Sequence, residues 1–194
     1  MKFINNYILE TIEILKNLDK DSINEAIKIL KKCQKKNGRI FFSGCGGGAG
    51  HASHATNDFR KICNIESYCI TDNVSELTAR INDEGWITSY SNWLKVSKFS
   101  NKDILFVFSV GGGNLEKKVS LNLIETIKYA KKQKGKIISV IGKKKSFAYK
   151  NSTVSIVIPN NNPKNITPHT EGLQAVVWHM MVSHKSLQAN KTKW

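Results

Sequence analysis

The sequence predicts a doubly wound α/β fold, with a parallel five-stranded sheet flanked by helices and a pair of helices before it. Two observations lead to this prediction. Short, continuous apolar runs of strand length alternate with longer helical stretches, which is typical of a parallel sheet buried on both faces. Glycine-rich loops directly follow two of these runs, where such folds turn from a strand into a helix. The 194 residues, 40% of them hydrophobic, are enough for one such domain.

Residues 1–37 predict the pair of helices. Apolar side chains recur at near-helical spacing until Asp19 to Asp21 interrupt them. Ser22-Ile23-Asn24-Glu25 then has the pattern of a capping box and would start the second helix, which Asn37-Gly38 ends. Because one face of this pair is too apolar for water, we expect it to pack on the sheet layer or on another subunit.

Residues 38–194 predict the sheet and its covering helices. The expected strands are Arg39–Ser43, Ser67–Ile70, Asp103–Ser109, Lys136–Ile141 and Val154–Ile158. The expected helices are Ala52–Lys61, Trp86–Val96, Leu115–Lys134 and Thr170–His184. With no long linker and no repeat of fixed period, we expect residues 1–194 to form a single domain.

The charge balance narrows the choice of partners. Lys and Arg number 30 against 15 Asp and Glu, so the formal net charge is +15. An anionic metabolite, nucleic acid or an acidic membrane surface would suit this charge. Only three of the cations are Arg, the residue that makes bidentate contacts to bases, and no nucleic-acid-binding motif is present. We therefore expect a solvated lysine surface, a small anionic ligand and no nucleic-acid partner.

Nothing in the sequence indicates a membrane or secreted protein. No apolar run approaches the ~20 residues of a membrane span, and the first residues lack a signal-peptide core. The four cysteines form no C-x-x-C pair and are too few for a disulfide scaffold. We expect a cytoplasmic protein with reduced thiols and no contact with a membrane.

The two glycine-rich loops, Ser43–Gly50 and Ser109–Asn114, are the first candidate site. Each would place free N–H groups and a helix N-terminus at the carboxyl end of a strand, which suits a phosphorylated ligand. A P-loop is excluded, because no Lys-Ser/Thr pair follows either loop. Two alternatives stay open: Gly44-x-Gly46-x-x-Ala49 with Glu66 about 20 residues on matches a relaxed dinucleotide fingerprint, and both loops could be plain tight turns.

Histidines and carboxylates form the second candidate site. His54 and Asp58 are four residues apart, so they share one face of a helix. A later helix, with Thr167 as its expected N-cap, carries Glu171 and His179. Such clusters suit metal binding or acid/base work. Eight residues separate Glu171 from His179, about 12 Å along a helix axis, so Glu171 is the least secure member.

Together these residues resemble the sugar-isomerase (SIS) domain family, and within it the phosphoheptose isomerases. The family's first loop, G-N-G-G-S, corresponds to Gly44-Cys45-Gly46-Gly47-Gly48. Its H-x-x-x-E helix corresponds to His54-Ala55-Thr56-Asn57-Asp58, and its Gln and His eight residues apart to Glu171 and His179. Its second loop, S-T-S-G-N-S, corresponds to Ser109–Asn114. The resemblance covers nearly the whole chain.

This resemblance implies a function and a set of site residues. It implies a Rossmann-like ketose/aldose phosphate isomerase, converting sedoheptulose 7-phosphate to D-glycero-D-manno-heptose 7-phosphate for lipopolysaccharide or capsule. It also implies a homotetramer with active sites at subunit interfaces and one Zn²⁺ per subunit. Asp58 and His179 would be the catalytic acid/base pair, in either order. The metal ligands would be His54, Asp58, Glu171 and His179, and the substrate-binding residues Cys45, Gly46, Gly47, Gly48, Asp83, Ser109, Val110, Gly111, Asn114 and Glu171.

The sequence also departs from the family pattern. Asp58 replaces a Glu, and Glu171 replaces a neutral Gln, which adds negative charge to the cluster. Both loops have lost hydroxyl groups, with Gly48, Val110 and Gly111 where Ser or Thr is common in the family. The alternative function is therefore a non-catalytic protein of the same fold, which senses a sugar phosphate or binds a replication initiator.

Overall fold

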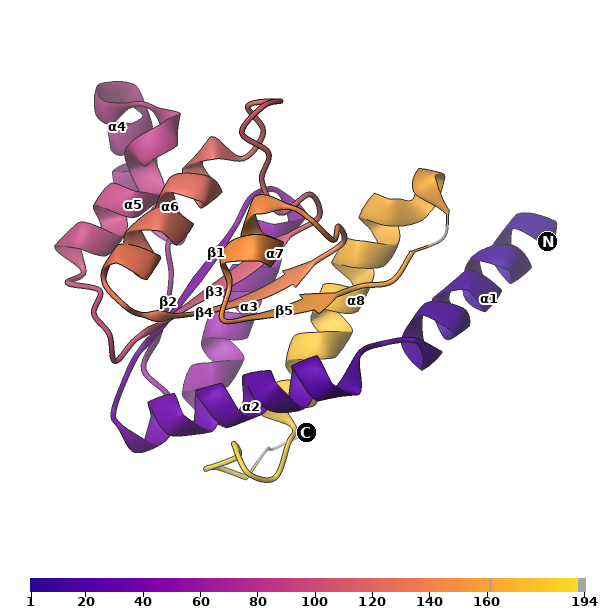
Figure 1. The fold of residues 1–194 in the computed structure, drawn as a ribbon. Helices are drawn as coiled ribbons and strands as arrows, with labels where there is room; N and C mark the ends of the chain where they lie inside the picture. Colours follow the sequence, from indigo (N-terminus) through magenta and orange to yellow (C-terminus); the bar gives the residue numbers. More distant parts are fainter. Residues whose placement is uncertain (161, 192–194) are drawn as a thin grey trace.

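Five strands form one parallel sheet in the order β2-β1-β3-β4-β5 (Figure 1). The computed structural model describes residues 1–160 and 162–191. The predicted fold class is confirmed, and each predicted strand lies within one residue of its observed bounds. The strands are β1 (Ile40–Gly44), β2 (Ser67–Cys69), β3 (Ile104–Ser109), β4 (Lys136–Ile141) and β5 (Val154–Val157).

The register of the sheet brings the two glycine-rich loops together. β1 pairs with β3 in parallel, with Phe42 opposite Phe106 and Gly44 opposite Phe108. Both strands therefore end at the same edge of the sheet, and the loops that follow them start side by side. In open parallel sheets this edge is where ligands bind.

Helices cover both faces of the sheet. One face carries α2, α3 and α8, and the other carries α5, α6 and α7, with α4 against α5. The helices are α1 (Lys2–Lys16), α2 (Lys20–Lys35), α3 (Gly47–Lys61), α4 (Val74–Glu84), α5 (Trp86–Val96), α6 (Leu121–Lys132), α7 (Phe147–Asn151) and α8 (Ile166–Val182), and a 3₁₀ turn spans Pro163–Asn165.

Two predicted helix starts were wrong because a local cap lies elsewhere. The N-cap of α2 is Asp19, whose carboxylate accepts hydrogen bonds from the backbone N–H groups of Asp21 and Ser22. The expected capping box at Ser22 therefore lies inside the first turn. α8 begins at Ile166 and follows the 3₁₀ turn directly, so Thr167 is helical and not the N-cap.

Three other differences concern the glycine-rich loops and short helices. α3 begins at Gly47, five residues before its predicted start, so the second half of the first loop is helical. α6 begins at Leu121, not Leu115, because Asn114 and Val119 pair in an isolated bridge. The sequence reading missed α4 and α7, on which only Ala148 is buried.

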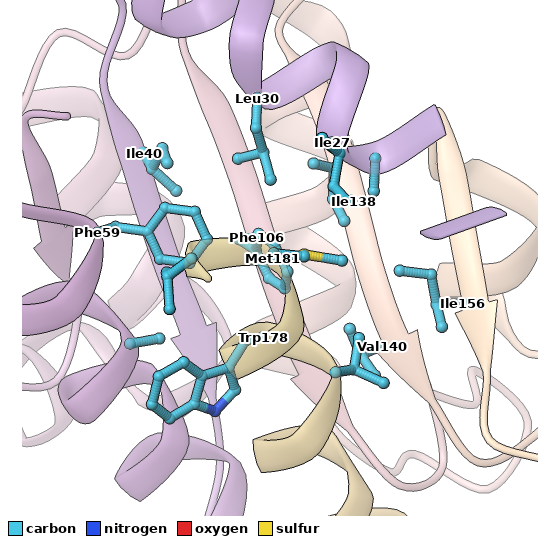
Figure 2. Packing of buried hydrophobic residues seen from close by; sticks show 14 of the residues in the cluster. Ile27, Leu30, Ile40, Phe59, Phe106, Ile138, Val140, Ile156, Trp178 and Met181 are labelled. Atoms are coloured by element: carbon cyan, nitrogen blue, oxygen red, sulfur yellow. The ribbon is translucent and has the colours of Figure 1, made fainter. Parts of the chain in front are cut away.

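The core between the sheet and α2, α3 and α8 is aliphatic and aromatic (Figure 2). Trp178 and Met181 of α8 and Phe59 of α3 pack against the sheet, and each is fully buried. Burying one such side chain stabilises the fold by roughly 1.5–3 kcal/mol. This packing fixes α3 and α8 beside each other on the same face.

Helix α1 stands apart from this core (Figure 1). Only Ile14 of its side chains is buried, whereas Phe3 is 72% and Leu9 63% exposed. α2 packs on the sheet layer as expected, but α1 leaves its apolar face uncovered. Among the described residues, no helix has the length and apolar character needed to cross a membrane.

Candidate active site

His54 and Asp58 of α3 meet His179 of α8 on the outer side of the α3–α8 pair. One ligand atom from each of the three lies within 4.8 Å of the others. The Nε2 atoms of His54 and His179 are each 3.8 Å from Oδ2 of Asp58. Residues 121 positions apart in the sequence thus form one cluster, because the two helices pack side by side.

Neighbouring groups orient the carboxylate and one imidazole. Asn57 donates a hydrogen bond from Nδ2 to Oδ1 of Asp58 over 2.8 Å, which leaves Oδ2 facing the histidines. Nδ1 of His179 lies 2.8 Å from the carbonyl oxygen of Ala175. That carbonyl can only accept, so Nδ1 is the donor and Nε2 is the nitrogen that faces Asp58.

Burial differs sharply within the cluster. The side chain of Asp58 is only 5% exposed, whereas those of His54 and His179 are 59% and 47% exposed. The buried ring of Trp178 supports both imidazoles, stacking on His179 with ring centroids 3.5 Å apart and meeting His54 edge-on at 4.8 Å. The cluster is therefore a buried carboxylate under two solvent-facing imidazoles.

The chemistry of this donor set fits a divalent metal such as zinc. Zinc binds imidazole nitrogen and carboxylate oxygen at 2.0–2.2 Å. The three donors converge, and Nε2 is the nitrogen of His179 that faces Asp58. His54, Asp58 and His179 are the side chains that would hold such an ion.

Glu171 does not join this group. It lies two turns before His179 on α8, and its carboxylate lies against Gly47 at the start of α3. A Cβ atom built on Gly47 would come within 2.6–2.8 Å of the carboxylate carbon and both oxygens of Glu171. Eight residues along a helix correspond to about 12 Å along its axis, and the assignment of Glu171 as a metal ligand stays a prediction.

The first glycine-rich loop is shaped by close approach of the backbone. Gly46 is the N-cap of α3 with φ of 56°, in the left-handed region that favours glycine. A Cβ on Gly48 would come within 2.7 Å of the carbonyl oxygen of Phe108, so the first turn of α3 lies directly on the end of β3. Cys45 is half-buried, and Asn122 donates a hydrogen bond to its sulfur over 3.3 Å.

The second loop uses most of its polar groups internally. Ser109 accepts a hydrogen bond at Oγ from the N–H of Gly112 over 3.0 Å, and Val110 accepts one at its carbonyl from Gly142. Asn114 accepts one at Oδ1 from the N–H of Lys117 over 2.8 Å. At Gly111 a Cβ would meet nothing within 4 Å, so the loop is open there.

Asp83 lies on α4, a different element from the two loops and from the helices that carry the cluster. It stands near the end of α4, is exposed, and accepts a hydrogen bond from Asn82 over 2.7 Å. α4 packs against α5, which covers the face of the sheet opposite α3 and α8. The role of Asp83 in binding the substrate stays a prediction.

The sequence reading missed three contributors to the site. Asn57 precedes Asp58 directly, and an amide beside a candidate carboxylate is a weak but usable signal. Trp178 was not singled out from the sequence, and only the fold places its ring against two imidazoles. His51 lies one turn before His54; burial lowers its pKa below the ordinary value, and the Glu171 charge acts in the opposite direction.

Comparisons with known proteins agree with this fold. The sequence profile of the SIS domain matches residues 4–142. The lincomycin biosynthesis protein LmbN of Streptomyces lincolnensis is 27% identical over 192 residues, covering 93% of this chain and 68% of that protein. The phosphoheptose isomerase GmhA of Neisseria gonorrhoeae superposes with a TM-score of 0.80 at 20% identity, covering 93% of this chain and 95% of that one.

A phosphoheptose isomerase from Francisella tularensis gives a TM-score of 0.79 at 20% identity, with the same coverage of 93% and 95%. At this identity the two structures demonstrate a shared fold, and the profile match over most of the chain demonstrates common descent. The resemblance read from the loops and the histidine helix is confirmed: this chain belongs to the SIS domain family.

Proposed function

We propose that this protein is a ketose/aldose phosphate isomerase that converts sedoheptulose 7-phosphate to D-glycero-D-manno-heptose 7-phosphate, as a step toward lipopolysaccharide or capsule. The observation that carries the proposal is the convergence of His54, Asp58 and His179 on one point. The likeness of the fold to phosphoheptose isomerases supports the choice of substrate. A module that only binds a sugar phosphate has no need of this cluster.

The reaction requires one group to move a proton at carbon and another to move a proton at oxygen. A ketose phosphate becomes an aldose phosphate when a proton moves between C1 and C2 through an enediol. Asp58 suits the carbon, because Asn57 holds Oδ1 of its buried carboxylate and Oδ2 faces the two histidines. His179 suits the oxygens, because its exposed ring can exchange protons with water.

The cluster also supports a metal-assisted reaction. His54, Asp58 and His179 are the side chains that would hold Zn²⁺, and Glu171 is not needed for this set. When bound, the ion supplies positive charge that polarises the substrate carbonyl. The glycine-rich loops at the adjacent sheet edge would then bind the rest of the sugar phosphate.

We also propose a cytoplasmic homotetramer with sites at subunit interfaces. The uncovered apolar face of α1 and the exposure of both histidines support contact with another copy of the chain. The four cysteines are free in the structure, which suits a reducing compartment.

An isomerase assay tests the proposal. Purified protein is incubated with sedoheptulose 7-phosphate, with added zinc or with a chelator, and the aldose product is followed by mass-resolved chromatography. We expect conversion that the chelator abolishes and zinc restores. Conversion that the chelator does not reduce would contradict the proposed role of zinc in the reaction. No conversion in either condition would overturn the isomerase and favour a sugar-phosphate sensor.

A further inference from the structure

The carboxylate of Glu171 fills the start of α3. Gly47 is the first helical residue of α3, and the space beside it is taken by this carboxylate at 2.6–2.8 Å from where a Cβ would stand. Glu171 comes from α8, so two helices far apart in sequence meet here. Gly47 and Glu171 form a matched pair, since any side chain at position 47 would displace the acid.

The start of α3 lacks a negative charge of its own. α3 has 15 residues, its N-cap Gly46 has no side chain to accept a hydrogen bond, and no acidic residue lies in its first turn. A helix of this length carries a partial positive charge at its N-terminus and attracts an anion there. In this protein the carboxylate of Glu171, from α8, lies at this N-terminus.

We infer that Glu171 sets the specificity of the first glycine-rich loop, closing it to phosphate and presenting a carboxylate to hydroxyl groups of the substrate. This inference rests on the proposed function, since it concerns how a sugar phosphate lies in that site. The negative charge of Glu171 repels a phosphate group, so a substrate whose phosphate lies at this loop binds less favourably. The same oxygens accept hydrogen bonds from a polyol chain, which carries donors and no charge.

The substitution Glu171→Gln tests the inference without turnover. Glutamine keeps the size of the side chain and removes its charge, so the variant should fold, which circular dichroism checks. The probe is inorganic phosphate, titrated into protein labelled with ¹⁵N at glycine. We expect phosphate to move the amide signals of Gly46, Gly47 and Gly48 in the variant and not in the unchanged protein, with a Kd at least about tenfold lower in the variant.

Glu125→Gln is the matched control, because it makes the same charge change at an exposed acid on α6 that pairs with Lys128. We expect this variant to bind phosphate as the unchanged protein does. If Glu171→Gln and Glu125→Gln behave alike, or if phosphate already moves the glycine signals of the unchanged protein, the inference is wrong. If Glu171→Gln gains phosphate affinity in a protein that converts no sedoheptulose 7-phosphate, the inference stands and the proposed function fails.

Discussion

Asp58 is the residue on which the candidate site depends most, because it faces both histidines from a buried position. We predict that Asp58→Asn lowers kcat about 10²–10⁴-fold, the usual contribution of general acid–base catalysis. Asparagine preserves the shape and the contact with Asn57, so the melting temperature should change little. Turnover and thermal unfolding of the purified variant measure the two effects. Asp72→Asn, at an exposed turn, is the control, and near-normal turnover in Asp58→Asn would rule out its catalytic role.

Asn57 holds the carboxylate of Asp58 from outside the cluster. Groups that orient a metal ligand typically change metal affinity 10–100-fold when they are removed. We therefore predict that Asn57→Ala weakens zinc binding about 10–100-fold, measured by competition with a chelating dye. Ser53→Ala, exposed on the same helix, should leave zinc affinity unchanged. Equal affinities in both variants would mean that the Asn57 contact is incidental.

At the scale of residues, the structure brings together three of the four predicted metal ligands, His54, Asp58 and His179. His54 and Asp58 follow from i,i+4 spacing, which fixes a shared helix face. His179 was a candidate by its residue type, but only the resemblance grouped it with His54 and Asp58, because nothing local shows which helix packs beside another. Glu171 was assigned as a ligand through the same resemblance, yet its carboxylate lies over Gly47. The support from Trp178 and from the Ala175 carbonyl arises only once α8 is packed.

Among the helices, α2 has the best-defined start. Asp19 accepts hydrogen bonds from Asp21 and Ser22 and so satisfies N–H groups that would otherwise lack partners. We predict that Asp19→Ala lowers the free energy of unfolding by about 1 kcal/mol. Urea unfolding at neutral pH measures this. Lys20→Ala, at the next position, should lower the free energy of unfolding much less. An equal decrease in both variants would contradict the role of Asp19 as a stabilising N-cap.

Asp103 joins the starts of two neighbouring strands. Its buried carboxylate accepts hydrogen bonds from the backbone and guanidinium of Arg39, before β1, and from Ser100. Because hydrogen bonds to charged groups are worth about 1.5–3 kcal/mol, Asp103→Ala should destabilise the protein by about that amount. Ser97→Ala, whose backbone carbonyl alone contacts Arg39, is the control.

The same carboxylate predicts a dependence of stability on pH. Burial acts to raise the pKa of Asp103, but hydrogen bonds from Arg39 and Ser100 outweigh it and leave the pKa below its ordinary value of 3.8. The stabilisation is therefore complete above pH 3.8 and is lost as the pH falls below it. Urea unfolding from pH 6 to pH 3 should show that the difference in the free energy of unfolding between the unchanged protein and Asp103→Ala becomes smaller as the pH falls. A difference that stays constant with pH would contradict a stabilising role for the negative charge of Asp103.

The elements themselves were predicted unevenly, for a physical reason. Strands such as Lys136–Ile141 and the helix Trp86–Val96 were placed correctly, because buried runs and clear periodicity fix them. The starts of α3 and α6 were wrong by five or six residues. Glycines permit both a loop and a helical turn, so position 47 could not be placed without its contact to Glu171. The short helix α7 is too brief to show a period.

For the molecule as a whole, one side chain fixes the position of α1. Glu10 accepts hydrogen bonds from Asn162 and Asn165 and lies 3.0 Å from the buried His169, which packs on Tyr7. Hydrogen bonds from Asn165, His169 and Asn162 lower the pKa of Glu10 from 4.5 to about 2. This contribution to stability is complete above pH 4.5 and is lost as the pH falls toward 2.

We predict that Glu10→Ala releases α1, so that a protease cuts within residues 2–16 faster than in the unchanged protein. Between pH 5 and pH 2 the melting temperatures of the two proteins should converge. Glu13→Ala, one turn along the same helix, is the control. Equal cleavage of Glu10→Ala and Glu13→Ala would mean that another contact positions α1.

The order β2-β1-β3-β4-β5 also bears on how the chain is made. Read along the sequence, every strand after β1 pairs with a strand that has already been synthesised. The sheet can therefore grow outward from β1 while the ribosome is still translating, with no gap left for a later strand. The exception is α8, which supplies Trp178 and Met181 to the core only at the end. A nascent chain that stops before residue 166 contains all five strands but lacks α8, so the apolar face that Trp178 and Met181 cover is exposed and favours aggregation.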